Sequence, residues 1–382
     1  MNDQPWLGDA WQEINLDALT SNLRSIRDAL SSGVKICAVV KADAYGHGMR
    51  CCAEALWAAG ADLIATASIR EALSLRWTLP NVRLWAMGAA SDDLLEAAVI
   101  NGIALTICDT AQARRLGDIA ESLGLTASIH IKLDTGFHRL GFTMEDAPIE
   151  LPRIMEMSNV RVDGLFTHLA LIDRERDEAQ MARFFSVADG LSARGHSPML
   201  HAVDSIAAFR YPQWRLGMVR VGAILYGNHI AEAPFTPHKV MRLCARIVSL
   251  RTIQPGDTVG YDEDYHVERP TLIATIPLGY ADGLPRRLRE SGEASVRGQR
   301  VRYAGMPCMD QSMLDVTGVP GVSVGDTVTV LGGDGCDAIP VEEFARWVGS
   351  NRNEPLAAIG RRVPRVYYEN DIITGTDDPL LD

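Results

Sequence analysis

Eight short apolar runs, separated mostly by stretches with helical periodicity, occupy the first two-thirds of this chain. The runs lie at residues 34–40, 63–67, 82–87, 104–108, 127–133, 162–168, 199–203 and 218–226. The helical stretches lie at 52–59, 94–100, 111–123 and 178–193, and a further amphipathic segment, 16–30, precedes the first run. Alternating strands and helices predict a parallel sheet, and eight such units favour closure into a (β/α)8 barrel. An open doubly wound sheet remains an alternative, although no Gly-x-Gly-x-x-Gly follows an early strand.

The last third of the chain has a different pattern. From about residue 239 the helices drop out, and short β-branched segments broken by Pro and Gly lie at 245–250, 271–276, 300–303 and 327–331. This pattern predicts a mainly antiparallel β domain. A length of 382 residues is also more than one core usually supports. We therefore expect two domains, a barrel over residues 1–238 and a β domain over residues 239–382.

Composition excludes several classes of partner. The net charge of −12 argues against nucleic acid and against an anionic membrane surface. No apolar run approaches the length of a membrane span, and residues 1–5 lack the features of a signal peptide. The seven cysteines have no metal-ligand spacing, so we expect no metal site and a cytoplasmic protein with reduced thiols.

Lys41 stands at the end of the first apolar run, where polar and glycine residues begin. In a parallel αβ barrel, that end of a strand faces the catalytic loops. Lysine is suited to Schiff-base formation because its pKa falls readily on desolvation. A lone lysine here is more simply a salt-bridged surface residue. Tyr45, Gly46 and Gly48 favour a site, since they add a hydroxyl and a backbone that can approach a ligand closely.

Polar residues also follow the later runs. Arg139 offers a fork of donors that matches a carboxylate, although an arginine in a turn can simply be exposed. His168 ends the sixth run, where a lone histidine is usually a satisfied core group. No second ligand follows it at metal spacing.

Residues 39–48, Val-Val-Lys-Ala-Asp-Ala-Tyr-Gly-His-Gly, closely resemble the pyridoxal-phosphate lysine motif of alanine racemases. The resemblance covers nearly the whole chain and continues in order. The further matching segments lie at 132–141, 201–205, 219–227, 260–265, 278–286, 306–311 and 362–367.

The resemblance implies a pyridoxal 5'-phosphate enzyme with the following sites. The residues that match cofactor contacts are Lys41, Tyr45, His168, Ser205, Arg220, Gly222 and Ala223. Lys41 and Tyr265 match the two acid–base residues, and Arg139, Met309 and Asn353 match positions beside the substrate. Lys132 matches a lysine that is often carbamylated in the family and holds the arginine in place. Because the tyrosine of the family reaches the other subunit's active site, a homodimer with shared active sites is implied.

Arg220 supports racemase chemistry on physical grounds. An arginine cannot hand a proton to a pyridine nitrogen, whereas an aspartate partner keeps that nitrogen charged. With arginine, the carbanion is less delocalised and reprotonation at Cα is favoured over side reactions.

Two positions depart from the family pattern. Asp204 stands where an asparagine is usual, and Asn353, followed by Pro355, stands where the family has a tyrosine. Asparagine is smaller, and its amide both donates and accepts hydrogen bonds. An apolar pocket rejects an added hydroxyl by only about 100-fold. A modest gain in the binding of the serine hydroxyl therefore brings serine into the range of usable substrates.

The prediction is therefore a racemase that interconverts L- and D-alanine, with serine or a broader range of small amino acids as the alternative. Two hypotheses come from other classes. One is a non-catalytic cofactor carrier, which needs no domain bearing Tyr265. The other is a fold-related amino-acid decarboxylase, which lacks the segments at 279–283 and 308–311.

Overall fold

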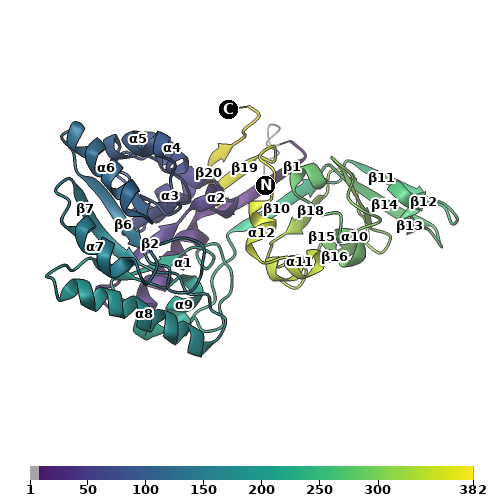
Figure 1. Ribbon diagram of the computed structural model, residues 1–382. Helices are drawn as coiled ribbons and strands as arrows, with labels where there is room; N and C mark the ends of the chain where they lie inside the picture. The colour runs from purple at the N-terminus through teal and green to yellow at the C-terminus, as the bar shows by residue number, and fades with distance from the viewer. Residues whose placement is uncertain (1–7, 382) are drawn as a thin grey trace.

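The computed structural model describes residues 8–381 and shows an eight-stranded parallel barrel at one end and mainly antiparallel sheets at the other (Figure 1). The order of the barrel strands is β8-β7-β6-β5-β4-β3-β2-β9. Their bounds are β2 Lys35–Val39, β3 Leu63–Thr66, β4 Leu84–Ala86, β5 Ala104–Ile107, β6 Ala127–Lys132, β7 Val160–Phe166, β8 Met199–His201 and β9 Met218–Val221. Gly217 N donates to Leu200 O at 3.0 Å, which joins the last two strands. The barrel prediction and its eight runs are confirmed.

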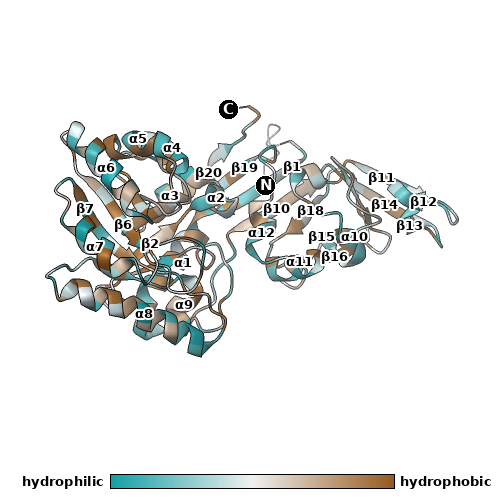
Figure 2. Ribbon diagram, in the orientation of Figure 1, coloured by the Kyte–Doolittle hydropathy of each residue, from teal (hydrophilic) through white to brown (hydrophobic). Residues whose placement is uncertain are grey.

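Helices connect the barrel strands and cover the outside of the barrel (Figure 1). They are α1 Leu16–Ala29, α2 Lys41–Tyr45, α3 Met49–Ala58, α4 Ile69–Thr78, α5 Leu95–Ile100, α6 Thr110–Ser122, α7 Ala147–Met155, α8 Arg174–Ser192 and α9 Ser205–Arg210, with short 3-10 turns η1 Asp92–Leu94 and η2 Pro212–Trp214. Hydrophilic and hydrophobic stretches alternate along helices such as α6 and α8 (Figure 2), as expected for amphipathic helices lying on a sheet.

Side-chain caps define where many of these helices begin. Asn15 accepts from Ala18 N at the start of α1, and Ser68 forms a capping box with Glu71 at the start of α4. Asp204, the departure from the family pattern, caps α9 by accepting from the N–H groups of Ile206 and Ala207. Its side chain therefore has a structural role that the sequence did not reveal.

The barrel interior contains large aromatic and polar side chains. Trp85 and Phe166 pack edge to face inside it, together with Cys37 and two buried histidines, His130 and His201. Closely packed interiors of this kind are rigid, and the buried polar groups must find hydrogen-bond partners there.

The second part of the chain forms a seven-stranded sheet of order β16-β15-β18-β10-β1-β19-β20, with smaller sheets β11-β14-β17 and β12-β13 beside it (Figure 1). The strands are β1 Ala10–Asn15, β10 Met241–Arg246, β11 Ser249–Ile253, β12 Thr258–Val259, β13 Tyr265–His266, β14 Thr271–Ile276, β15 Glu293–Val296, β16 Gln299–Arg302, β17 Ser312–Asp315, β18 Thr327–Leu331, β19 Arg365–Glu369 and β20 Ile372–Asp377. The helices are α10 Leu288–Ser291, α11 Val341–Val348 and α12 Asn353–Ala357, with 3-10 turns η3 Tyr261–Glu263 and η4 Tyr280–Asp282.

The strand β1 is a feature that sequence patterning missed. It precedes the barrel in the chain but lies in the second sheet, antiparallel to β10 and parallel to β19. The two parts of the molecule are thus linked at the start of the chain as well as after β9. No helix within residues 8–381 combines the length and the apolar character needed to cross a membrane.

Candidate active site

Lys41 follows β2 at the carboxyl end of the barrel strands and begins a left-handed turn. Ala42, Asp43, Ala44 and Tyr45 all have positive φ, between 52° and 54°. For residues with a Cβ this conformation costs about 1–2 kcal/mol each. Strain of this kind persists only where the surroundings hold it, and it is commonly found at functional sites.

Contacts from distant parts of the chain hold this turn. Ala42 N donates to Glu71 Oε1 at 2.9 Å, and Met49 N donates to Asp43 Oδ1 at 2.7 Å. Arg365, from β19, places Nη2 2.8 Å from Asp43 Oδ2 and donates from Nε to Gly46 O at 2.9 Å. The turn is therefore fixed by side chains of both parts of the molecule.

The amine of Lys41 lies in a cationic environment. Burial and the charge of Arg139 lower its pKa, while Glu71 and Asp204 act in the opposite direction. A lower pKa leaves a larger fraction of the amine neutral and nucleophilic at neutral pH.

The same cations act on His168. Burial is the main cause that lowers its pKa to about 3, and Arg220, Arg139, Lys132 and Lys41 lower it further. His168 is therefore neutral at physiological pH. The ring of Phe137 bridges His168 and Arg139, with its centroid 5.0 Å from the imidazole and 4.5 Å from the guanidinium carbon. The guanidinium of Arg139 makes no hydrogen bond or ion pair with another residue of the range 8–381, so its donors are free for a ligand.

Lys132 is a buried amine without a carboxylate partner. Its side chain donates to Leu133 O at 2.6 Å, and the residue is 3% exposed. Burial and then Arg220 lower its pKa to about 8. A substantial neutral fraction is the condition for reaction of an amine with carbon dioxide.

Three groups from separate elements meet at the ends of β9 and β8. Gly222 N donates to Ser205 Oγ at 2.9 Å, and a Cβ built on Gly222 would lie 2.5 Å from the hydroxyl of Tyr45. Glycine is thus required by the close approach of Tyr45. Ala223 N has no acceptor among the described residues. Hydroxyl and backbone N–H groups converging at a barrel rim are typical of phosphate sites.

Arg220 is 5% exposed and is held by three hydrogen bonds. Nη2 donates to Thr167 O at 2.8 Å and to Ala202 O at 2.9 Å, and Nη1 donates to His201 Nδ1 at 3.0 Å. Burial lowers its pKa to about 10, so the guanidinium remains a cation at neutral pH.

Asn353 begins α12, which packs against the turn that carries Lys41. A Cβ on Gly46 would lie 2.1 Å from Leu356 O, which shows how closely the two segments approach. Asn353 Oδ1 accepts from Asn228 Nδ2 at 2.8 Å, and Asn228 Oδ1 is buried with no partner among residues 8–381. Pro355 lies in the first turn of α12, where a missing N–H is tolerated.

Tyr265 and Met309 do not join these residues within the chain. Tyr265 lies on β13, in the small sheets at the far end of the molecule from the barrel (Figure 1). Burial and a 2.9 Å hydrogen bond to Asp315 raise the pKa of its hydroxyl to about 12. Met309 is 54% exposed, and its backbone carbonyl accepts a hydrogen bond from Ala281 N. The charge of Arg269 lowers the pKa of Tyr265 but does not offset burial and Asp315, so within residues 8–381 this tyrosine is not poised as a base.

The motifs of the last third nevertheless converge. Arg362 donates to Asp282 Oδ1 and to Asp310 Oδ1, each at 2.6 Å, and Tyr280 N donates to Cys308 O at 2.9 Å. The segments at 278–286, 306–311 and 362–367 thus form one surface that carries the exposed Met309.

Sequence reasoning missed several residues that position this site, namely Glu71, Arg365, His201 and Asn228. His201 and Arg365 lie in the matching segments 201–205 and 362–367, but the partners of all four residues are distant in the sequence, so their positioning roles could not be identified locally. Among residues 8–381, no group of three His, Cys, Asp or Glu side chains is placed to hold a metal ion.

Comparison with known proteins agrees with this arrangement. The alanine racemase N-terminal domain family matches residues 14–229, and the alanine racemase C-terminal domain family matches residues 240–367. An alanine racemase of Desulfovibrio desulfuricans is 36% identical over 94% of this chain and 98% of its own length. The structure of alanine racemase from Clostridium difficile 630 has a TM-score of 0.93 and 32% identity, covering 97% of this chain and 99% of that chain. The alanine racemase of Bacillus anthracis with bound L-Ala-P has a TM-score of 0.91 and 29% identity, covering 98% of each chain. The chain therefore belongs to the alanine racemase family.

Proposed function

We propose that this protein interconverts L- and D-alanine with pyridoxal 5'-phosphate, as a homodimer whose active sites are shared between subunits. The observation that carries the proposal is the separation within one chain of two sets of residues. The barrel rim provides an amine, a cradle suited to phosphate and one arginine with free donors, Arg139, whereas the matching tyrosine lies at the opposite end of the molecule (Figure 1).

The barrel-rim residues fit the cofactor. Tyr45, Ser205 and the N–H groups of Gly222 and Ala223 would hold the phosphate, as their convergence around a position that admits no Cβ suggests. Lys41 would attach the cofactor, because its amine is desolvated and lies among cations. His168, kept neutral mainly by burial and further by the surrounding cations, would lie beside the ring.

The cofactor, when bound, makes the Cα proton of the substrate acidic because the carbanion is conjugated with its ring. Arg220 determines how strong that effect is. It is held by two carbonyls and a histidine and cannot give up a proton, so it would leave the pyridine nitrogen of the cofactor unprotonated. Reprotonation at Cα is thereby favoured over side reactions.

Racemisation requires an acid–base group on each face of Cα. Lys41 would serve one face, and Tyr265 of the partner subunit would serve the other. Within its own subunit, Tyr265 is hydrogen-bonded to Asp315 and has a raised pKa, which disfavours a base. In the dimer, each Tyr265 would approach Arg139 of the partner subunit. That arginine has free donors, and its positive charge would lower the pKa of the tyrosine hydroxyl. The loop that carries Met309, from the same subunit as Tyr265, would cover the side of the active site where the substrate binds.

Serine is the alternative substrate. It is supported by Asn353, which stands in α12 against the Lys41 turn, and by Asn228, whose buried Oδ1 lacks a partner among the described residues. A substrate hydroxyl is the kind of donor that an unpaired amide oxygen accepts. The decarboxylase and carrier hypotheses are disfavoured, because the family match extends through residues 240–367. The seven free cysteines support the reducing environment of the cytoplasm.

Subunit mixing tests the shared site directly. Lys41→Ala and Tyr265→Phe are each expected to lose about 100- to 10,000-fold in rate, the range for a positioned acid–base group. In a mixed dimer, one site has both substitutions and the other has neither. Random reassociation of equal amounts should therefore restore about a quarter of the parental activity, since half the dimers carry one intact site of two.

The mixture discriminates among the alternatives. If Tyr265 acted in its own subunit, every mixed site would lack one residue and no activity would return. A Tyr265→Phe variant within about threefold of the parent, far below the acid–base range, would remove Tyr265 from the mechanism. Chiral separation of D- from L-alanine, together with measurement of carbon dioxide, distinguishes a racemase from a decarboxylase.

A further inference from the structure

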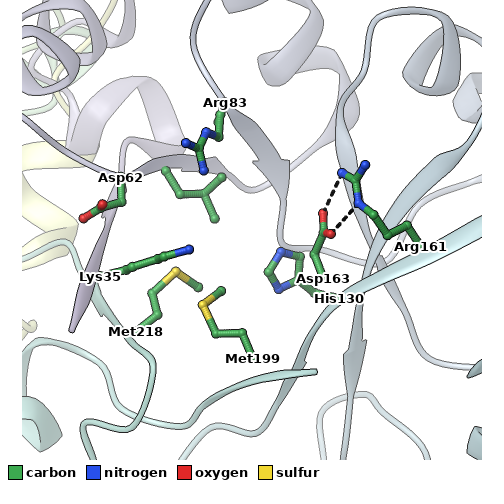
Figure 3. A pocket seen from close by; sticks show the side chains of 9 residues that line it. Lys35, Asp62, Arg83, His130, Arg161, Asp163, Met199 and Met218 are labelled. Atoms are coloured by element: carbon green, nitrogen blue, oxygen red, sulfur yellow. Dashed lines mark hydrogen bonds and ion pairs between the residues drawn. The ribbon is translucent and has the colours of Figure 1, made fainter. Parts of the chain in front are cut away.

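A second cavity lies at the other mouth of the barrel, away from the proposed active site. It has a volume of about 420 Å³ and is lined by Lys35, Asp62, Leu63, Arg83, His130, Arg161, Asp163, Met199 and Met218 (Figure 3). Lys35, Leu63, Met199 and Met218 are the first residues of β2, β3, β8 and β9. The cavity therefore opens at the amino ends of the strands, whereas Lys41 lies at the carboxyl ends.

The charges around this cavity leave an excess of cation. Asp62 is paired with Arg27 at 2.5 Å and also accepts from Ile36 N, and Asp163 is paired with Arg161 at 2.7 Å. The side chains of Lys35 and Arg83 have no hydrogen-bond or ion-pair partner within residues 8–381. They extend from one side of the cavity, opposite His130 and the Arg161–Asp163 pair (Figure 3).

A line of hydrogen bonds joins this cavity to Arg220. Arg220 Nη1 lies 3.0 Å from His201 Nδ1, and His201 Nε2 lies 2.9 Å from His130 Nδ1. Arginine is only a donor, so His201 Nδ1 accepts and its proton stands on Nε2. His201 then donates to His130 Nδ1, which places the proton of His130 on Nε2. Each tautomer is fixed by the one before it.

The remaining donor of this line is His130 Nε2–H. The residue is 2% exposed and lines the cavity, and Nε2 has no partner among the described residues. Burial, the largest cause, lowers the pKa of His130 to about 4, so the ring is neutral, and Arg220, which can only donate, sets the direction of the line. Because His130 lines the cavity, this donor is available to an acceptor that enters it.

The fold accommodates this histidine pair specifically. A Cβ on Gly164 would lie 2.3 Å from His130 Nδ1 and 2.8 Å from His201 Nε2, so only glycine at this position of β7 lets the two rings meet. Trp85 stacks on His130 with centroids 4.5 Å apart, and Phe166 stacks on His201 at 5.0 Å. The aromatic rings keep the pair rigid and exclude water from it.

We propose that the amino-terminal mouth of the barrel binds a small dianion bearing phosphate or carboxylate groups, which accepts from His130 and is held by Lys35 and Arg83. Binding of the anion at this mouth alters the hydrogen bond between His201 and Arg220. When His130 Nε2–H donates to an anion, its Nδ1 becomes a better acceptor for His201, and His201 in turn becomes a better acceptor for Arg220, because hydrogen bonds in a chain polarise one another. The anion site itself does not depend on the proposed function. An effect of the bound anion on the rate of racemisation does depend on it, through the proposed role of Arg220.

Titration calorimetry of the holoenzyme with inorganic phosphate, and separately with malonate, tests the site. Removing two charged partners in Lys35→Ala/Arg83→Ala should weaken binding at the mouth about tenfold or more. The matched control is Arg194→Ala/Arg251→Ala, which removes two exposed cations elsewhere and should bind as the parent does. The anion that binds more tightly identifies the source. Equal binding by the parent and Lys35→Ala/Arg83→Ala, or no binding of either anion, overturns the proposal.

Nitrogen-15 spectra of the histidines, in the same titration, test the coupling and exclude binding at the active site. The His130 and His201 signals, assigned by their loss in His130→Gln and His201→Gln, should both shift in the parent, and in Lys35→Ala/Arg83→Ala the same shifts should need about tenfold or more anion. In Gly164→Ala, which separates the rings, only the His130 signal should shift. A parental His130 shift without a His201 shift overturns the coupling, and an unmoved His130 signal overturns the site. These spectra do not depend on catalysis, so a protein that binds the anion but fails to racemise alanine would overturn the proposed function alone.

Discussion

Nη2 of Arg365 lies 2.8 Å from Oδ2 of Asp43, joining the first strand after the last helix to the left-handed turn that carries Lys41. Arg365 is 2% exposed, and it also donates to Gly46 O and to Asp377. A buried guanidinium with several partners holds its position firmly, because breaking one contact leaves a charge unsatisfied. The orientation of Lys41 is therefore set by a residue of the second sheet.

The strain in that turn predicts an unusual stabilising substitution. Ala42 has φ 52° and is exposed, so Ala42→Gly removes the strain without loss of packing. We expect the free energy of unfolding to rise by about 0.5–1 kcal/mol, the left-handed penalty less the greater chain entropy of glycine. The control, Ala179→Gly in the exposed middle of α8, should lower it by about 1 kcal/mol. Urea titration of both variants makes the comparison, and a loss of stability in Ala42→Gly would show that the turn is not strained.

Lys41 is expected to be the cofactor lysine. The purified protein should be yellow, and Lys41→Ala should lose both the absorbance of the attached cofactor and the racemisation of alanine. Absorbance spectra and chiral chromatography measure the two losses. Racemisation by the variant at the parental rate would reduce Lys41 to a charge at the end of a strand.

Arg220→Glu is expected to change reaction specificity. A carboxylate facing the ring nitrogen favours its protonation and deepens the electron sink, so racemisation should fall and some transamination should appear. Pyruvate formed from alanine, detected with lactate dehydrogenase, measures this side reaction. Arg220→Lys keeps the positive charge and should give no pyruvate. Retention of cofactor by both variants must be verified by absorbance, since mere cofactor loss would instead assign Arg220 a binding role.

Asn353 is expected to admit serine. The parent should racemise serine at a rate comparable to alanine, and Asn353→Tyr should restore preference for alanine by refilling the space beside the substrate. Rates for both amino acids, in both directions, give the ratio. Pro355→Ala is the control, because it tests whether Pro355 changes the path of α12 and thereby the substrate preference. This variant should leave the ratio unchanged. If the parent ignores serine, or if Asn353→Tyr leaves the ratio unaltered, the protein is simply an alanine racemase.

Lys132 is expected to form a carbamate. Only the neutral amine reacts with carbon dioxide, and burial lowers the pKa of Lys132 to about 8. At fixed dissolved carbon dioxide, the carbon-13 signal of the adduct should therefore grow from about pH 7 to about pH 9, well below the ordinary lysine range. The signal should vanish in Lys132→Ala and persist in Lys35→Ala. An unlabelled Lys132 across this range would leave its amine bonded only to Leu133 O.

The barrel could be predicted from the sequence because its determinants are local. Each strand is a short apolar run, each helix has a buried face at helical spacing, and their alternation restricts the connections to those of a parallel sheet. The candidate residues Lys41, Arg139 and His168 were found for the same reason, since each stands at or after the end of an apolar run and the ends of parallel strands share one rim, whereas Ser205 was found from the family resemblance.

The remaining features depend on contacts between residues far apart in the chain, which only the tertiary structure decided. The strand β1 pairs with β10 and β19, although no local pattern in residues 10–15 indicates which strands it pairs with. The left-handed turn violates the intrinsic preference of its alanines and exists because Arg365 and Glu71 hold it. The line from Arg220 through His201 to His130 joins three strands and depends on a glycine in a fourth, Gly164 of β7. Local propensity determined the elements, and long-range hydrogen bonds and packing determined how the chemistry was assembled on them.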